Sequence, residues 1–417
     1  MNLKSCPGYT VNQFCNLNLG KKTTLELSGL DILIPGMSEF EMFIMKNSVM
    51  PIYMDRHDVS ETVTAENVAH LHQQDVKIQD QFGCKGLTYW FDDKRKTAFC
   101  LIEAPNMEAI EKMHDKAHGQ VPNSIIEVES SIVESFLGRI EDPEKAHDAE
   151  FNIINDPAFR TIMVMSLTRL TQTKSDSSQF KSLLRSFNLD VRNILKKYDG
   201  FPVNQTDYHY LVSFKSVTNA ARAAYEIQLT GKEFSKHDIE EKILLKIGLD
   251  AGVPVTKKQL IFEDTIKFAE RICEVVKGEI IVSAEVKDLY KSENANTFIR
   301  GKGIITLTPA DEQFITLYMD YTDANWSNTN LKVDHFIKPV GCSKSQLYRK
   351  MILLTGKSPN TFIQEYRLKE AIKLLSKKRG NISEIAFEAG FSSPSYFTKC
   401  FKKKFGLLPA IYLNSLQ

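Results

Sequence analysis

The first third of the chain alternates between short apolar runs, as in strands, and segments with helical spacing. Thr64 is a candidate helix N-cap, Gly83 a helix stop, and Asn106 the start of a second helix. The order strand, helix, strand, strand, helix, strand is typical of a ferredoxin-like unit, in which two helices cover one face of an antiparallel sheet. The predicted strands span residues 52–54, 87–91, 98–102 and 125–128.

The middle of the chain repeats this alternation after a polar stretch. Residues 138–156 are rich in Asp, Glu and Asn and contain Pro143, which indicates a linker. From there to about residue 320 strands and helices alternate, which predicts a second α+β domain. The predicted strands are 162–165, 210–214, 244–249 and 279–282, and the predicted helices are 177–198, 219–229 and 265–276.

The last part of the chain carries four helix starts that capping chemistry marks. Ser343 is followed by Gln346 three places on, and Asn381 by Glu384, which is the arrangement of a reciprocal capping box. Proline follows a capping serine at 358–359 and 393–394. Gly341 and Gly390, just ahead of two of these starts, can adopt the positive φ of a tight turn. The pattern predicts two helix-turn-helix units.

These patterns predict a multidomain chain in which two α+β domains, the first ferredoxin-like, precede an all-α domain with two helix-turn-helix units. The predicted divisions are an arm without assigned role at 1–45, the first domain at 46–137, a linker at 138–156, the second domain at 157–321, a polar linker at 322–330 and the helical domain at 331–417.

Composition narrows the class of protein. A chain of 417 residues is long enough for several domains, and its 42% hydrophobic and 25% charged residues are ordinary for globular proteins. No apolar run reaches the roughly 18 residues of a membrane span, and no secretory signal opens the sequence. The seven cysteines form no Cys-x-x-Cys pair, which argues against a disulfide framework or a zinc site and for a reducing cytoplasm.

Charge divides the chain sharply. Residues 331–417 hold 16 basic and 5 acidic side chains, a net charge of +11, whereas the rest holds 37 and 47, a net charge of −10. Such a basic module on an acidic body is expected when one module meets phosphates, although a lysine-rich solvated surface looks the same in composition.

Each helix-turn-helix copy has an apolar inner face and a polar, basic outer face. Gln346 and Arg349 can make paired hydrogen bonds to adenine and guanine edges, whereas the outer lysines suit phosphates. Lysine runs such as 402–404 are also common on solvated surfaces. The candidate DNA-contacting residues are Ser343, Lys344, Ser345, Gln346, Arg349, Lys350, Ser393, Ser395, Tyr396, Lys399, Lys402 and Lys403.

The C-terminal 85 residues or so resemble the AraC/XylS transcriptional regulators. The resemblance implies two helix-turn-helix units, joined by a helix from Pro359 to about Leu375, that place recognition helices in successive major grooves of double-stranded DNA. No helix is evident before Leu331, and Pro339 should kink or end the first helix of the first unit. We therefore expect the first unit to dock less rigidly than the second. The matching segments are 343–350, 355–359, 367–369 and 381–405.

The second α+β domain resembles a class III nucleotide cyclase. The resemblance implies metal-binding carboxylates at positions that hold Ser166 and Tyr208, and the adjacent Asp207 would face the other side of an extended segment. Lys267 replaces an expected Asn, although Arg271 is retained. We therefore expect a non-catalytic domain used for dimerisation or ligand sensing. The best-matching segments are 246–249, 268–272 and 278–283.

The first domain holds five of the nine histidines. His114 and His118 lie one helical turn apart, and His57 ends a strand that could lie beneath them, so the three are candidate ligands for nickel, zinc or copper. Unliganded surface histidines at this spacing are also common. Segments 50–57, 89–90, 100–105 and 114–119 resemble a family of small ferredoxin-like bacterial proteins with a nickel-binding member. Asp55 and Glu103 are further candidate ligands.

The sequence thus predicts a non-enzymatic, cytoplasmic, homodimeric transcription regulator controlled by a metal ion or a small ligand. RNA polymerase is a further candidate partner, and a membrane is not. Two alternatives stay open: an active cyclase with an attached DNA-binding segment, and a metal-storage protein in which DNA contact is secondary.

Overall fold

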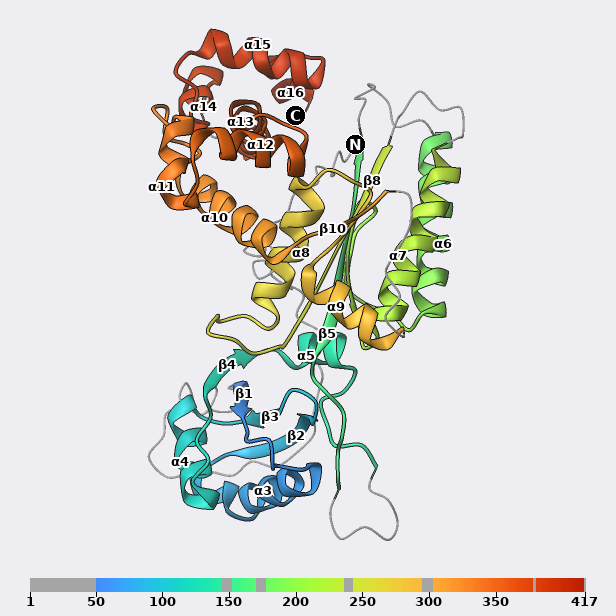
Figure 1. Cartoon of the computed structure of the whole chain (residues 1–417), viewed down its shortest axis with the longest axis vertical. Helices are drawn as coiled ribbons and strands as arrows, with labels where there is room; N and C mark the ends of the chain where they lie inside the picture. The colour runs from blue at the N-terminus through green and yellow to red at the C-terminus, as the bar shows by residue number, and fades with distance from the viewer. Residues whose placement is uncertain are drawn as a thin grey trace, which may run out of the picture. The chain divides into compact units, whose positions relative to one another are not determined.

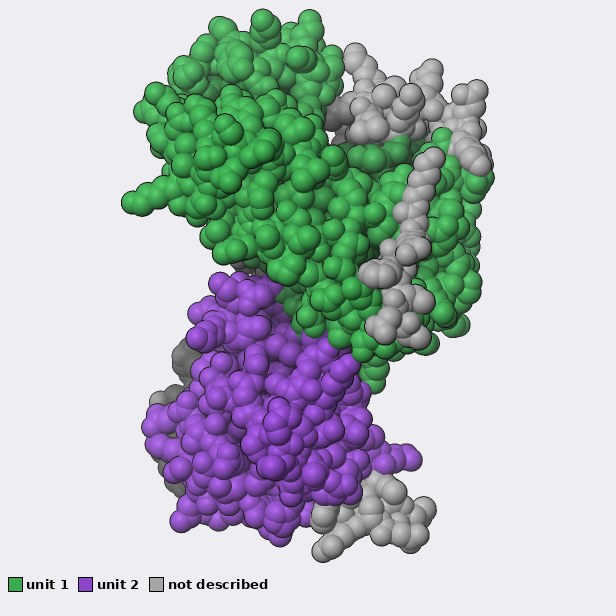
Figure 2. Space-filling model, viewed as in Figure 1, with its two compact units in different colours: residues 1–7, 160–252, 265–417 green, residues 8–159, 253–264 purple. Residues whose placement is uncertain are grey.

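The computed structural model describes residues 50–144, 152–169, 178–235, 243–294, 303–377 and 380–415, so the predicted arm at 1–45 lies outside the described residues. The chain divides into two compact units (Figure 2). We call residues 8–159 with 253–264 the N-terminal unit, and residues 1–7, 160–252 and 265–417 the C-terminal unit. No helix among the described residues has the length and apolarity needed to cross a bilayer.

The N-terminal unit contains one antiparallel sheet with strand order β2-β3-β1-β4 (Figure 1). The predicted succession of strands and helices is confirmed, and one further helix, α5, follows the last strand. The elements are β1 (Ile52–Asp58), α3 (Ala65–Ile78), β2 (Lys85–Asp92), β3 (Thr97–Glu103), α4 (Met107–His118), β4 (Ser124–Val128) and α5 (Ser130–Leu137).

Local chemistry starts and stops these helices as the sequence predicts. Thr64 forms a capping box with Asn67 at the start of α3, and the Asn106 side chain caps α4. Gly83 ends the helical segment in the left-handed conformation, which costs glycine little. Alternate strand residues, such as Tyr53 and Tyr89, then pack with α3 and α4 in one buried cluster. The side chains of interest lie in this layer between sheet and helices.

The C-terminal unit begins with a six-stranded sheet of order β10-β9-β8-β5-β7-β6. Its predicted strands and helices are present, whereas the two edge strands, β10 and β6 with its exposed Phe201, have no counterparts among the predicted strands. The elements are β5 (Arg160–Arg169), α6 (Ser178–Lys197), β6 (Phe201–Gln205), β7 (His209–Phe214), α7 (Val217–Phe234), β8 (Ile243–Gly252), α8 (Glu263–Val275), β9 (Ile280–Val282), α9 (Ala284–Glu293), β10 (Ile304–Thr306) and α10 (Pro309–Asn325).

Short helices make up the rest of this unit, and all four predicted helix starts are confirmed by their caps. Gly390 has a φ of 79°, and a Cβ there would clash with the Trp326 carbonyl oxygen, so the turn requires glycine. The elements are α11 (Ile337–Val340), α12 (Lys344–Thr355), α13 (Pro359–Ser376), α14 (Ile382–Glu388), α15 (Pro394–Phe405) and α16 (Pro409–Ser415). We call residues 331–417 the helix-turn-helix module. Within it, α11 with α12 is the first helix-turn-helix unit, or first unit, and α14 with α15 is the second unit.

A helix that was not evident from the sequence precedes the first unit. Helix α10 starts at a capping box of Thr308 and Asp311 and runs to Asn325, so the polar stretch at 322–330 begins inside a helix. The buried Thr322 hydroxyl donates a hydrogen bond to the Tyr318 carbonyl oxygen. Because the last turn of the helix contains polar residues such as Thr322, the sequence pattern did not reveal the helix. Helix α11 ends at Val340, one residue after Pro339, as expected of a proline there.

Candidate functional sites

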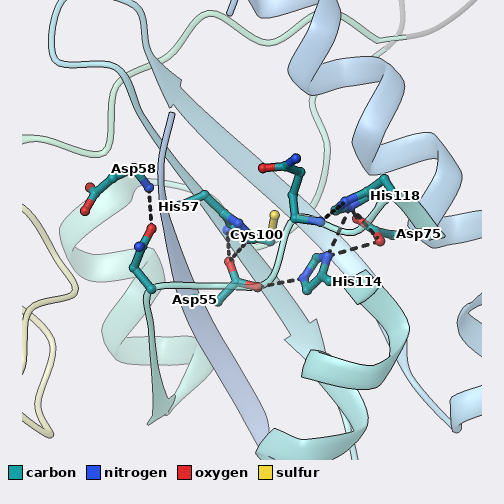
Figure 3. A network of polar contacts seen from close by, with 9 residues as sticks. Asp55, His57, Asp58, Asp75, Cys100, His114 and His118 are labelled. Carbon is teal, nitrogen blue, oxygen red and sulfur yellow. Dashed lines mark hydrogen bonds and ion pairs between the residues drawn. The ribbon is translucent and has the colours of Figure 1, made fainter. Parts of the chain in front are cut away.

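A buried cluster of histidine and aspartate side chains lies between the sheet of the N-terminal unit and the helices α3 and α4 (Figure 3). Asp55 and His57 are alternate residues of β1 and so point to the same side of the strand. Asp75 comes from the inner face of α3, and His114 and His118 come from one face of α4. The fold therefore gathers five polar side chains from three elements.

His114 lies at the centre of this cluster. Its Nε2 atom is 2.9 Å from Oδ2 of Asp55, and its Nδ1 atom is 3.1 Å from Oδ1 of Asp75. Nε2 of His57 lies 3.4 Å from Oδ1 of Asp55, and Nε2 of His118 lies 3.1 Å from Oδ1 of Asp75. Atoms bound to one ion through bonds of about 2.1 Å lie about 3.0–3.4 Å apart, so these spacings suit a metal site.

Among the described residues, two sets of three could hold an ion, namely Asp55 with His57 and His114, and Asp75 with His114 and His118. The hydrogen bonds distinguish them. The backbone N–H of Gln120 donates to Nδ1 of His118, which leaves the proton of a neutral His118 on Nε2, facing Asp75. In the first set, Nε2 of His114 would become a ligand once the ring lost the proton that faces Asp55, while Asp75 orients His114 from behind, as carboxylates orient metal-bound histidines.

The cluster requires a positive charge. Asp55 is fully buried; its burial raises its pKa, but the adjacent His57 and His114 lower it below the ordinary value. Burial disfavours the His114 imidazolium, but the carboxylates on both sides of the ring raise its pKa to about 10. Buried carboxylates need a bonded cation, and either a proton on His114 or a metal ion supplies it.

The predicted ligands fall into this cluster only in part. His57, His114 and His118 lie close together, but no single set of three contains all of them. The structure joins Asp55 to the set, whereas Glu103 lies 3.9 Å from Lys85 and belongs to neither set. Sequence reasoning missed Asp75, although a carboxylate seven residues after the buried Val68 of α3 was a usable signal.

The candidate DNA-contacting residues of the first unit surround the start of α12. Ser345 and Arg349 are exposed, and no ion pair with a described carboxylate holds Arg349. Gln346 is exposed too, but its Oε1 accepts the Ser343 backbone N–H at 2.9 Å in the capping box. That oxygen has a second lone pair for an adenine amino group.

Two lysines of the first unit have partners within the protein. Lys344 lies 2.8 Å from Asp334 in an exposed ion pair. Lys350 donates to the Ala310 carbonyl oxygen at 3.3 Å and lies 3.7 Å from Asp311, so its ammonium faces the start of α10. The expectation that Lys350 points away from the protein is therefore wrong, because the sequence pattern did not reveal α10.

The second unit exposes a comparable surface on α15. Ser393 caps the helix, and Ser395 and Lys399 are exposed. The hydroxyl of exposed Tyr396 accepts a hydrogen bond of 2.6 Å from Gln364. Lys402 and Lys403 are exposed as well. Lys404 is different, because Glu365 of α13 pairs with both Lys404 and Lys357, at 3.0 and 2.7 Å.

Family models match two separate parts of the chain. A helix-turn-helix domain model matches residues 338–415, and a model described as nickel responsive protein SCO4226-like matches residues 53–128. The chain therefore carries an AraC-type helix-turn-helix domain at its C-terminal end and an SCO4226-like domain ahead of it, as the sequence predicted.

Similar proteins match only segments. Histidine kinase P4 of Formosa agariphila is 41% identical over 26% of this chain and 8% of its own length. An uncharacterized HTH-type transcriptional regulator in the cgkA 5' region of Pseudoalteromonas carrageenovora is 36% identical over 22% of this chain and 53% of its own length. The solved structure of SCO4226 from Streptomyces coelicolor is 28% identical, with a TM-score of 0.18, and covers 18% of this chain and 94% of that one. The chain thus spans about half or less of these two curated relatives.

Proposed function

We propose that the protein is a transcription regulator that binds double-stranded DNA through both helix-turn-helix units. The observation that carries this proposal is the pair of capped helices α12 and α15, which expose Arg349 and Lys399 while their apolar faces are buried. Arginine pairs with guanine edges and lysine with phosphates. The net charge of +11 over residues 331–417 adds attraction to a polyanion.

Selection from a pool of random duplexes tests this proposal. The full chain at about 0.15 M salt should enrich two short motifs separated by about one helical turn, 10–10.5 base pairs, because each recognition helix enters one major groove. The double variant Arg349→Ala, Lys399→Ala should lose enrichment of the motif that Arg349 reads and should enrich the other motif more weakly, because a phosphate contact is lost as well. If the unmodified chain enriched no motif from the random pool, selective DNA binding would be contradicted.

We further propose that a transition metal ion binds Asp55, His57 and His114 and controls the regulator. The support is the donor set itself, two imidazoles and a carboxylate, which suits nickel, zinc or copper, and the match of residues 53–128 to the nickel-responsive model. When bound, the ion would supply the positive charge that the buried carboxylates require. Asp75 and His118 would hold His114 in position.

Calorimetric titration of the full chain with nickel, zinc and copper tests the metal proposal. His57→Ala should abolish tight binding, and His57 is the better target because its side chain is 12% exposed, against 1% for His114. His118→Ala should weaken binding about 10- to 100-fold, as loss of an orienting partner does. His70→Ala, on the exposed face of α3, should leave the titration unchanged.

The absence of binding heat with all three metals would end the metal proposal. Loss of binding in His118→Ala with full retention in His57→Ala would instead assign the ion to Asp75, His114 and His118.

We infer that the N-terminal domain is ferredoxin-like. We also infer that the second α+β domain, predicted at residues 157–321 and called the middle domain from here on, is cyclase-like but does not catalyse the cyclase reaction. The sheet order β4-β1-β3-β2 with two helices on one face supports the first inference. For the second, Ser166 pairs in register with His209 and Lys246, not with a carboxylate. Asp207 accepts from Asn188 at 3.3 Å. A catalytic cyclase would need carboxylates at these positions to hold the two metal ions that promote formation of the cyclic nucleotide.

An activity assay tests the middle domain. Purified protein with ATP or GTP and manganese should release no cyclic nucleotide. Release of a cyclic nucleotide would overturn the non-catalytic assignment and favour the active-cyclase alternative. Pairing of two chains, which the sequence predicted, would add a second DNA contact and raise affinity through effective concentration.

A further inference from the structure

Lys277 lies outside the matched helix-turn-helix segment, in the loop between α8 and β9, and yet its side chain lies beside the recognition helix of the first unit. Its backbone N–H donates to the Leu354 carbonyl oxygen at 2.7 Å, near the end of α12. Its Cδ atom lies 4.0 Å from the position that a Cβ on Gly356 would take. Lys277 is therefore part of the middle domain in the sequence, but in the fold it lies against the end of α12.

The loop that carries Lys277 is anchored just before the lysine. The preceding Val276 donates its N–H to Ile272 at 3.2 Å, and its carbonyl oxygen accepts from Lys246 at 2.6 Å. Further contacts join α8 to the module, because Glu274 pairs with Lys369 of α13 at 2.7 Å. A ligand that met Lys277 would have to order only the side chain, which keeps the entropic cost of binding small.

Lys277 and Arg349 line the same open hollow, of about 410 Å³, together with Tyr348, Ile352 and Leu353. No carboxylate lines it, and Lys277, which is exposed, has no ion pair with any described residue. Ile352 and Leu353 are 49% and 61% exposed, so they form an apolar surface beside the two cations. The hollow thus combines two unpaired cations with an apolar floor.

These properties match a DNA backbone next to a groove. A lysine ammonium suits a phosphate, and apolar side chains suit thymine methyl groups and sugars. We propose that Lys277 contacts a phosphate of the DNA that Arg349 reads, so that the DNA-binding surface extends from the helix-turn-helix module onto the middle domain. This inference rests on the proposed DNA binding.

Fluorescence anisotropy with the full chain and its selected duplex tests this inference. Lys277→Ala should weaken binding about 3- to 10-fold on every duplex alike, and should reduce the salt slope of log K by about 0.9, the loss of one phosphate contact. Lys277→Arg should retain both quantities. Lys196→Ala, which removes an exposed lysine of α6, should change neither.

Unchanged affinity and salt slope in Lys277→Ala would overturn the inference, and so would tighter binding, which would mean that the middle domain obstructs DNA. Arg349→Ala, measured in parallel, separates this failure from failure of the proposed function. If Arg349→Ala also binds like the unmodified chain, DNA recognition by α12 is itself wrong.

Discussion

The two helix-turn-helix units share their capping chemistry but differ in what supports them. Buried side chains of the first unit, such as Leu347, belong to one cluster with Phe336, which lies just before α11, and with Ile272 of α8 and Tyr318 of α10. The second unit packs with α13 and α16 in a separate cluster that contains Phe397 and Phe401. The first unit is thus continuous with the middle domain, whereas the second has its own core.

The contacts of the first unit argue against the expectation that it docks less rigidly. The ring of Phe336 stacks on Tyr318 of α10 at a centroid distance of 4.6 Å, and Phe362 of α13 meets the same ring. Arg271 of α8 pairs with Asp320 and, at 3.0 Å, with Asp323 of α10. Repeated local motifs therefore specify similar turns without specifying similar anchorage.

The largest expected effect comes from breaking the shared core. Phe336→Ala should lower the free energy of unfolding by about 3–5 kcal/mol, as removal of a buried aromatic ring does. Because its cluster spans α8, α10 and α12, backbone hydrogen exchange should accelerate in all three helices.

Phe401→Ala is the matched control, since both rings are fully buried. It should accelerate exchange in α13 to α16 and leave α8 and α10 protected. Acceleration confined to α11 and α12 in Phe336→Ala would show that the first unit is as independent as the second.

Substitutions of intermediate effect should show whether the two units contact DNA in the same way. Arg349→Ala should relax selection at one motif at a cost of about 1–3 kcal/mol, because an arginine–guanine pair reads a base. Lys399→Ala should weaken binding evenly and reduce the salt slope by about 0.9. Measured affinities for duplexes altered in one motif at a time decide between these patterns. Equal loss of selectivity in both variants would mean that α15 also reads bases through Lys399.

The smallest effect is expected at the ion pair between the middle domain and the module. Glu274 and Lys369 are 47% and 36% exposed, so a double-mutant cycle with Glu274→Gln and Lys369→Met should give a coupling energy of about 0–1 kcal/mol. Denaturant unfolding measures it. A coupling of several kcal/mol would mean that charge, not the shared apolar core, joins the first unit to the middle domain.

The sequence predicted where helices begin and end better than it predicted which elements pack against one another. Caps at Thr64, Ser343 and Asn381 were readable because each depends on residues three places apart. Helix α10 was missed because its last turn is polar, and Asp75 because its partners are distant in sequence and come from other elements. Lys277 carries no motif at all; only the fold places it beside Arg349.

Hydrogen exchange of the full chain with and without its selected duplex tests most directly whether both units bind DNA together. Bound DNA should slow exchange in the first turns of α12 and of α15 alike, and in the loop that holds Lys277. Slower exchange in only one of the two helices, or in neither, would contradict recognition of DNA by two units.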